Sequence, residues 1–282
     1  MARLLTISSW VARGHVGNSA TTFPLMRLGF DVCAMPTVVL AHHPGHAPNP
    51  ARVDMPDLLP MGTDILASPS PHPVDAVLVG YIAVSPQVAP IAGLVAEARA
   101  LKPGIPALVD PICGDDGALY VDEAIVAEIG ATLLPLADIV TPNVTELAAL
   151  TGRQDIAAAP DWPVEKIAEL ARTVPVPAVV VTSVVTGEGR IGNLVVTAES
   201  VHCVDVPRID GPKIHGTGDM MAGLILGKTL LGHALVDATA FATGAIHDLL
   251  AASASAGRDE LALASAQECL LHPRTKAEIT KV

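Results

Sequence analysis

The chain has 282 residues, of which 50% are hydrophobic and 16% are charged, and its formal net charge is −12 at pH 7. This composition is typical of a globular protein with a large core and excludes an intrinsically disordered chain. The acidic balance also argues against binding to nucleic acid or to an anionic membrane, because such binding needs clustered lysine and arginine.

The cysteines and the first residues indicate the cellular compartment in which the protein is expected. Cys33, Cys113, Cys203 and Cys269 form no CxxC pair and have no close spacing, so they predict reduced core thiols and no zinc site or disulfide framework. The opening MARLLTISSWVARGH offers only a short apolar stretch, far below the roughly 18 apolar residues of a membrane span. We expect a cytoplasmic protein with no membrane partner.

Short β-branched runs alternate with longer helical patterns along the chain. Strands are expected at 3–8, 31–40, 75–79, 106–110, 137–141 and 178–184, and helices at 17–29, 86–101, 122–134, 143–151 and 162–173. Continuous apolar runs are typical of strands covered on both faces. The order βαβα therefore predicts an α/β fold, a three-layer αβα sandwich with a mainly parallel central sheet, as one domain over residues 1–282.

The later part of the chain follows another pattern. Residues 190–206 predict a hairpin at an antiparallel edge of the sheet, and helices are expected at 217–231, 235–251 and 259–271, so that the sheet ends before residue 217. A Pro-rich stretch between 44 and 73 has no steady period. Because the β pattern continues on both sides of it, we expect a loop or lid at about 42–73 in preference to an interdomain linker.

The stretch HGTGDMMAG, residues 215–223, leads from a loop into an apolar helix. A helix start attracts anions, and Gly216 and Gly218 would let the backbone approach a phosphate closely. Asp219 could accept a proton from an attacking hydroxyl while the amides of Gly216, Thr217 and Gly218 hold the phosphoryl oxygens. On these letters alone, a glycine loop closed by an ordinary aspartate explains the pattern equally well.

Polar side chains also stand where predicted strands end, which is where open α/β sheets build their sites. These residues are Asp110, Thr141, Asn143, Glu146, Thr182 and Ser183. Each has a structural alternative: an Asp before Pro starts turns, TPNVTE can cap a helix, and β-branched residues are common at strand ends.

The GTGD sequence at the start of the last helical portion resembles the signature of the ribokinase-like small-molecule kinases. Within that group, ISSWVARGHVGNSATTFPLMRLGFDV near the N-terminus, GYI at 80–82, the segment 110–152 and GTGDMMAGLIL are similar to pyridoxal kinases. The likeness extends from the start of the chain to about residue 232.

This resemblance implies a function. The expected reaction is ATP-dependent phosphorylation of the 5′-hydroxymethyl group of pyridoxal in vitamin B6 salvage, with Mg²⁺, ATP as co-substrate, K⁺ or another monovalent cation, and a homodimer. It leaves the preference among pyridoxal, pyridoxine and pyridoxamine open, and also the identity of the monovalent cation.

The resemblance also assigns roles to individual residues. The expected substrate contacts are Ser9, His15, Val16, Tyr81 and Asp219. The expected nucleotide contacts are Asp115, Asn143, Glu146, Thr182, Ser183 and Gly218, and the expected metal ligands are Asp110, Asp115, Thr141 and Glu146. A serine hydroxyl can hydrogen-bond a pyridine substituent, and a tyrosine ring can stack on a flat partner.

Two departures and two alternatives accompany this reading. HHPGH at 42–46 stands near an NHTG-like segment of the family, with Pro44 in place of Thr, and Trp10 stands where the family usually has His. Loop histidines of this kind are more often solvated than zinc-bound. A hydroxymethylpyrimidine kinase of the same fold is the nearest alternative, although GHVGNSA differs from its GGAG-type segment, and a non-catalytic pyridoxal-binding protein is the other.

Overall fold

The computed structural model describes residues 2–55, 57–67, 74–211 and 213–282. Its strands are β1 (Arg3–Arg13), β2 (Asp31–His42), β3 (Arg52–Asp54), β4 (Ala76–Val79), β5 (Ala107–Val109), β6 (Gly114–Asp115), β7 (Ala118–Leu119), β8 (Ile139–Val140), β9 (Ala178–Gly187), β10 (Arg190–Thr197), β11 (Val201–Pro207) and β12 (Glu278–Lys281).

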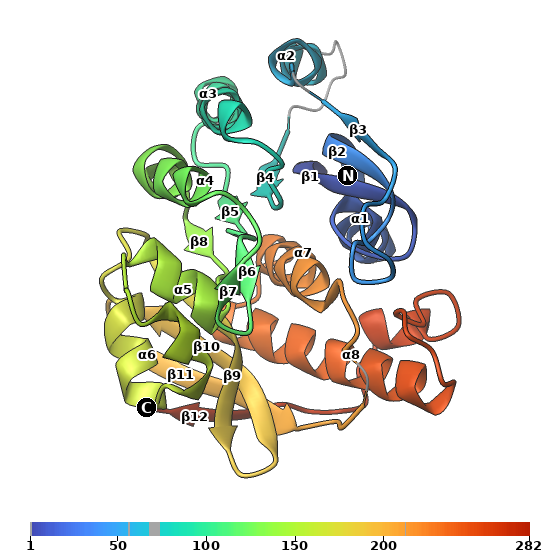
Figure 1. Ribbon diagram of the computed structural model, residues 1–282, viewed down its shortest axis with the longest axis vertical. Coiled ribbons are helices and arrows are strands. Elements are labelled where there is room, and N and C mark those ends of the chain that lie inside the picture. Colours follow the sequence, from blue (N-terminus) through green and yellow to red (C-terminus); the bar gives the residue numbers. More distant parts are fainter. Residues whose placement is uncertain (1, 56, 68–73, 212) are drawn as a thin grey trace.

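One ten-stranded sheet runs through the molecule in the order β12-β11-β10-β9-β8-β5-β4-β1-β2-β3 (Figure 1). The six strands from β9 to β2 pair in parallel, and β3, β10, β11 and β12 pair antiparallel to their neighbours. Strands β6 and β7 form a separate small hairpin. The α/β class and the mainly parallel central sheet expected from the sequence are confirmed.

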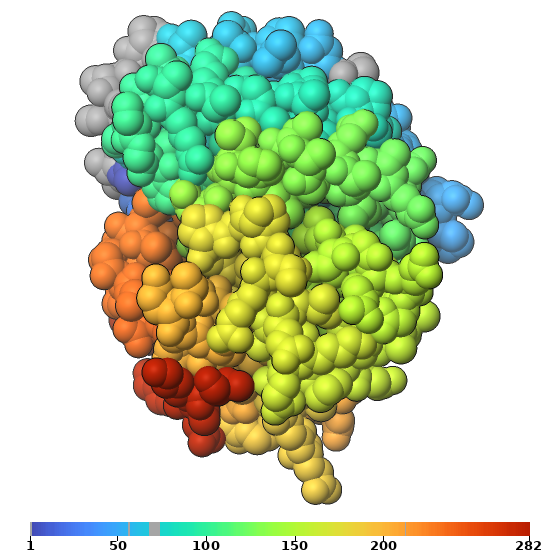
Figure 2. All heavy atoms as spheres, turned by 90° about the vertical axis from the view of Figure 1, so that its left-hand side faces the viewer, coloured from blue at the N-terminus to red at the C-terminus, as the bar shows by residue number. Residues whose placement is uncertain are grey.

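Helices cover both faces of the sheet. They are α1 (Asn18–Arg27), α2 (Leu59–Ala67), α3 (Val88–Leu101), α4 (Glu123–Glu128), α5 (Val144–Leu150), α6 (Val164–Ala171), α7 (Thr217–Leu230) and α8 (Leu235–Ser255). Helices α1, α7 and α8 pack on one face, and α2 to α6 lie on the other (Figure 1). In the side view of Figure 2, the teal to yellow segments that contain α3 to α6 cover the second face.

Alternation along the central strands divides the core between the two layers. In β4, Val77 and Val79 pack under α3 and its neighbours, whereas Ala76 and Leu78 pack under α7 and α8. Successive strand side chains point to opposite faces, so a strand that is apolar at every position is the expected result of two covered faces. Helix α7 is buried along residues 220–227, as its apolar sequence indicates.

Four expectations from the sequence were wrong in detail. Strands β1 and β9 continue past Ser9 and Ser183, so neither serine ends its strand. The region expected to be helical at 259–271 contains only a short 3₁₀ helix, Gln267–Leu270. The sheet does not end before residue 217, because β12 adds to its edge beside β11. Exposed β12 alternates only weakly, which hid it in the sequence.

The Pro-rich stretch is less irregular than expected. Strand β3 pairs with β2 as a hairpin, and α2 follows it, while residues 56 and 68–73 lie outside the described part of the chain. Gln87 ties this segment to the sheet, because its side-chain amide donates to Thr37 O at 2.8 Å and to Met55 O at 2.9 Å. The loop that joins β2 and β3 spans residues 43–51, and we call its first part, residues 43–46, the hairpin tip.

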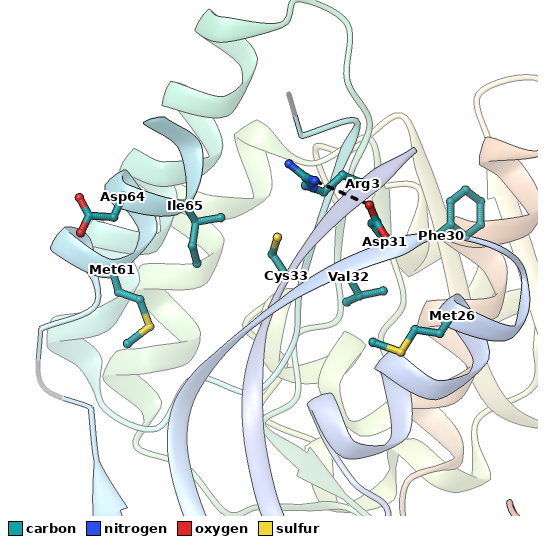
Figure 3. A pocket seen from close by; sticks show the side chains of 9 residues that line it. All are labelled: Arg3, Met26, Phe30, Asp31, Val32, Cys33, Met61, Asp64 and Ile65. Atoms are coloured by element: carbon teal, nitrogen blue, oxygen red, sulfur yellow. Dashed lines mark ion pairs between the residues drawn. The ribbon is translucent and has the colours of Figure 1, made fainter. Parts of the chain in front are cut away.

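A surface hollow of about 940 Å³ lies between α1, α2 and the start of β2 (Figure 3). Met26, Phe30 and Ile65 line it, and Arg3 forms an ion pair with Asp31 at 3.6 Å. It opens at the amino ends of the parallel strands, whereas ligands of open α/β sheets bind at the carboxyl ends. The predicted site residues do not line it.

Helix α8 is long and apolar enough to cross a membrane by length and composition alone. It packs against α7 and the sheet through Ala242, Ala245 and Leu249, which are fully buried. The core helix of a globular protein passes the same test, so this segment is weak evidence for a membrane span.

Candidate active site

The predicted site residues gather at the carboxyl edge of the parallel sheet. Asp110 directly follows β5, Thr141 follows β8 and Tyr81 stands two residues beyond β4. Helix α7 begins at Thr217 on the same edge, with Gly216 as its N-cap. The fold therefore brings together residues that are more than a hundred positions apart in the sequence.

The turn that leads into α7, residues 215–218, is shaped for close contact. Gly216 has φ +91°, a left-handed conformation that favours glycine, and a Cβ there would lie 1.8 Å from the carbonyl oxygen of His15. Gly218 is exposed, and a Cβ on it would meet nothing within 4 Å. The first glycine thus serves the chain's own packing, while the second leaves open space in front of the helix amides, where an anion is favoured. We call residues 215–218 the phosphate loop.

Asp219 lies in the first turn of α7 and is only partly accessible. Burial raises the pKa of its carboxyl to about 6, and a hydrogen bond from the backbone of Gly17 offsets part of that rise. The Thr21 hydroxyl donates to the Asp219 carbonyl at 3.3 Å and so fixes the helix start against α1. A carboxyl with this pKa is mostly ionised at neutral pH and basic enough to accept a proton.

Asn143 and Glu146 form the opening turn of α5. Asn143 Oδ1 accepts from the Glu146 amide at 2.9 Å, and Glu146 Oε2 accepts from the Asn143 amide at 2.8 Å. Glu146 Oε1 also accepts from the Cys113 amide at 3.1 Å, and Asn143 Nδ2 donates to Gly114 O at 2.8 Å. The capping role expected from TPNVTE is confirmed, and the same bonds tie α5 to the strand end that carries Asp115.

Asp110 and Glu146 are two buried carboxyls in one small region. Burial raises the pKa of both, and for Asp110 the charges of Glu146 and Asp219 raise it further. The Thr141 hydroxyl is buried without a hydrogen bond of regular geometry, although it lies near enough to Asp110 to offset part of the rise. Buried carboxyls whose pKa is raised in this way would be stabilised in their charged forms by a cation.

The oxygen donors around Asp110 fit a hard divalent ion such as Mg²⁺. Within the described ranges, no group of three or more His, Cys, Asp or Glu side chains forms a metal cage. Magnesium is usually held by one or two carboxylates together with waters and substrate phosphates.

Asp115 is more exposed than the buried carboxyls, and its charge helps to raise the pKa of Glu146. Its side chain is 43% exposed and forms an ion pair with Lys213 Nζ at 2.5 Å, and Asp116 pairs with the same ammonium at 2.7 Å. Lys213 therefore links the β6–β7 hairpin to the segment that enters the phosphate loop. Nothing in the sequence alone pairs this lysine with Asp116, 97 positions away.

Two of the predicted substrate contacts, Ser9 and Tyr81, lie on β1 and two residues beyond β4. Ser9 is buried, and a Cβ on Gly17 would lie 2.3 Å from its hydroxyl oxygen. The neighbouring Ser8 hydroxyl accepts from the Tyr81 amide at 3.0 Å, and the Thr37 hydroxyl donates to the Tyr81 carbonyl at 2.7 Å. Burial raises the pKa of the Tyr81 phenol. Tyr81 is thus fixed between β1 and β2.

His15, Val16, Thr182 and Ser183 complete the predicted set. Val16 is buried, and burial lowers the pKa of half-buried His15 beside the phosphate loop. Thr182 donates its amide to Pro142 O at 2.8 Å, next to the α5 cap. Ser183 has φ +59° and an exposed side chain. A non-glycine residue at positive φ is uncommon and often marks a functional constraint.

Tyr120 was missed by the sequence analysis. Although 57% of its surface is accessible, burial raises the pKa of its phenol, and the charges of Glu146, Cys113, Asp110 and Asp219 raise it further. Its backbone amide donates to Cys113 O at 3.0 Å. The signal that could have indicated it is its place at the end of GDDGALY, which brings it opposite Cys113 in the β6–β7 hairpin.

The chain is similar to known proteins along nearly its whole length. The family model described as phosphomethylpyrimidine kinase matches residues 65–263. Pyridoxal kinase PdxY of Deinococcus radiodurans is 34% identical over 96% of this chain and 93% of its own, and that of Pseudomonas syringae pv. tomato is 33% identical over 99% and 98%. The structure of pyridoxal kinase from Leishmania donovani in complex with ADP and pyridoxamine covers 100% of both chains, with a TM-score of 0.84 and 30% identity.

Proposed function

This chain belongs to the pyridoxal kinase family, and on that premise we propose that it transfers the γ-phosphoryl group of ATP to the 5′-hydroxymethyl group of pyridoxal, giving pyridoxal 5′-phosphate. The observation that carries the proposal is the pairing of Asp219, with its pKa raised to about 6, and the open space before Gly218. A base and an anion-binding helix start stand side by side there.

In the proposed step, the 5′-hydroxyl oxygen attacks the γ-phosphorus and ADP leaves with the electrons of the broken phosphorus–oxygen bond. Asp219 accepts the hydroxyl proton. The amides of Gly216, Thr217 and Gly218 hold the phosphoryl oxygens. Because the transition state of phosphoryl transfer is loose, positioning and electrostatic stabilisation supply most of the catalysis.

The nucleotide side of the proposal rests on the buried polar cluster. Asp115, Asn143, Glu146, Thr182, Ser183 and Gly218 are proposed to contact the nucleotide. Asp110, Asp115, Thr141 and Glu146 are proposed to hold Mg²⁺, directly or through water, and K⁺ or another monovalent cation. Bound Mg²⁺ would neutralise charge on the phosphate oxygens. The chain's own part is to keep the carboxyls in place through the α5 cap and to exclude water by burial.

The acceptor is proposed to lie against Ser9, His15, Val16 and Tyr81, with the hairpin tip above it. The acceptor side of the site is the part that distinguishes pyridoxal kinase from the alternative, hydroxymethylpyrimidine kinase. The matched family model begins at residue 65, beyond β1, β2 and β3, and its description names a phosphomethylpyrimidine kinase. The curated relatives that cover β1 to β3 as well, at 34% and 33% identity, are pyridoxal kinases. Their identity along the whole chain favours pyridoxal.

The proposal extends to a single cytoplasmic domain that acts as a homodimer. The test is ATP consumption by the purified chain with Mg²⁺ and K⁺, comparing pyridoxal, pyridoxine, pyridoxamine, hydroxymethylpyrimidine and ribose. Turnover with the B6 vitamers supports the proposal. Turnover with hydroxymethylpyrimidine alone would assign the rival activity, and tight pyridoxal binding without turnover would indicate a carrier.

A further inference from the structure

Histidines from two distant segments meet beside the phosphate loop. The imidazole of His43, at the tip of the β2–β3 hairpin, lies against that of His215, the first residue of the phosphate loop. Their ring centroids are 4.2 Å apart and the planes are inclined by 37°. The two residues are 172 positions apart in the chain, so this contact joins the hairpin directly to the loop in front of Asp219.

The hairpin tip is built so that this contact is close. The His46 amide donates to the His43 carbonyl at 3.0 Å, and the Gly45 amide donates to His43 Nδ1 at 3.1 Å, which fixes the ring from its own turn. A Cβ on Gly45 would lie 2.5 Å from His215 Nε2 and 2.9 Å from His43 Nδ1. Only glycine leaves room for both rings at this position.

A second contact holds the same tip from the other side. His46 Nε2 lies 3.3 Å from Glu260 Oε1, and His46 Nδ1 lies 3.9 Å from Asp259. Arg13 Nε reaches the same Glu260 oxygen at 3.5 Å. The tip is therefore held between the phosphate loop and the segment after α8, with β1 completing the contact.

We propose that His215 is a positioning residue, which latches the hairpin tip onto the phosphate loop by stacking on His43 and so holds the lid over the acceptor site. The part of this inference that concerns the acceptor rests on the proposed function. The latch itself does not, because it is a contact within the free protein.

The charges around the two rings make the latch sensitive to pH. Burial, together with the charges of His215, His46, His42 and Lys213, lowers the pKa of His43 to about 4. Burial also lowers the pKa of His215, with Lys213 and His46 acting in the same direction and Asp115 opposing them. Because the latched state disfavours protonated imidazoles, it binds fewer protons than an open state, and acidification must favour opening.

The test is amide hydrogen exchange of Gly45 and His46 in the free protein, corrected for the pH dependence of intrinsic exchange. His215→Ala should raise exchange at pH 7.5 by about tenfold, the effect of losing one ring pair. His215→Phe keeps a ring that cannot be protonated, so it should remain protected at pH 7.5 and lose less protection at pH 5.5 than the unmodified chain. His272→Ala, at an exposed histidine away from the site, should behave as the unmodified chain.

Equal protection in His215→Ala and the unmodified chain would overturn the latch. So would loss of protection in His215→Phe equal to that in His215→Ala, because the ring contact would then not be the cause. The KM for pyridoxal is measured in parallel and should rise in His215→Ala with little change in kcat. If the substitutions change amide exchange but no B6 vitamer is turned over, the latch stands and the proposed function is wrong. If pyridoxal is turned over normally but the substitutions leave amide exchange unchanged, the proposed function stands and the latch is wrong.

Discussion

The side chains of Asn143 and Glu146 each accept a hydrogen bond from the backbone amide of the other, at 2.9 and 2.8 Å. This reciprocal cap satisfies amides that the helix start would otherwise leave unpaired. In this protein the same two side chains also reach Gly114 O and the Cys113 amide. The first turn of α5 thus stabilises the fold and also positions Glu146, the carboxyl proposed to face the nucleotide.

Asn143→Ala should therefore change stability and nucleotide binding together. Loss of the cap should cost about 1–2 kcal/mol of unfolding free energy, measured by urea unfolding, and the KM for ATP should rise severalfold. Asp122→Ala is the matched control, because Asp122 caps α4 by accepting from the Ala124 amide at 2.9 Å. That variant should lose similar stability with an unchanged KM, and a KM rise in both would refute a local nucleotide role for Asn143.

The pH dependence of catalysis follows from Asp219. The base must be ionised, and burial raises its pKa to about 6, so kcat/KM should be level above pH 7 and fall tenfold per pH unit well below pH 6. The pH profile should be measured in the His215→Phe variant. Because the phenylalanine ring cannot be protonated, opening of the latch then contributes least to the loss of activity at low pH. A profile that is flat down to pH 5 would exclude Asp219 as the base.

The raised pKa of Asp219 predicts that the ionised carboxylate needed for activity lowers the stability of the fold. Because the folded state prefers the protonated form, ionised Asp219 destabilises the fold at neutral pH; this penalty is absent below about pH 4, the usual range of an aspartate, and is complete above about pH 6. Asp219→Asn should therefore raise the free energy of unfolding at pH 7.5 by on the order of 1–2 kcal/mol after solvent screening, and by almost nothing at pH 4.

In the same variant, kcat should fall on the order of 100-fold or more. Urea unfolding at the two pH values measures the stability change. A destabilised and inactive Asp219→Asn would instead indicate that the carboxylate is needed for structure.

The sequence was sufficient to predict the α/β class and the mainly parallel sheet, although the ends of β1 and β9 were placed too early. Apolar runs and helical periods indicated the parallel strands, and the polar residues after them, such as Asp110 and Thr141, led to the proposed location of the site. Local chemistry in GTGD and TPNVTE predicted the start of α7 and the cap of α5. These features depend on near neighbours in the chain, and short windows of sequence record them.

Contacts between distant segments could not be predicted in this way. Lys213 pairs with Asp115 and Asp116, and His215 stacks on His43, only because the fold brings separate loops to one edge. Strand β12 was missed because its four residues are exposed and carry no strong alternation. In each case the deciding interaction lies outside any local window.

Substitutions at the two glycines of the phosphate loop should separate effects on stability from effects on catalysis. At Gly216 an added Cβ would clash with the His15 carbonyl at 1.8 Å, and φ is +91°. Gly216→Ala should therefore destabilise the fold by several kcal/mol through strain and displaced backbone. At Gly218 the Cβ would meet nothing within 4 Å, so Gly218→Ala should leave the melting temperature within about 2 °C of the unmodified chain, since alanine is favoured in a helix.

The chemistry of Gly218→Ala should nevertheless suffer, because the new methyl group would occupy space in front of the amides that are proposed to hold the phosphoryl oxygens. We expect kcat/KM for ATP to fall at least tenfold, on the scale of losing one donor to the transferring group. Thermal unfolding and steady-state kinetics on the two variants measure these effects. Full activity in a stable Gly218→Ala protein would show that the phosphate does not approach this turn, and the anion site would then have to lie elsewhere along the carboxyl edge.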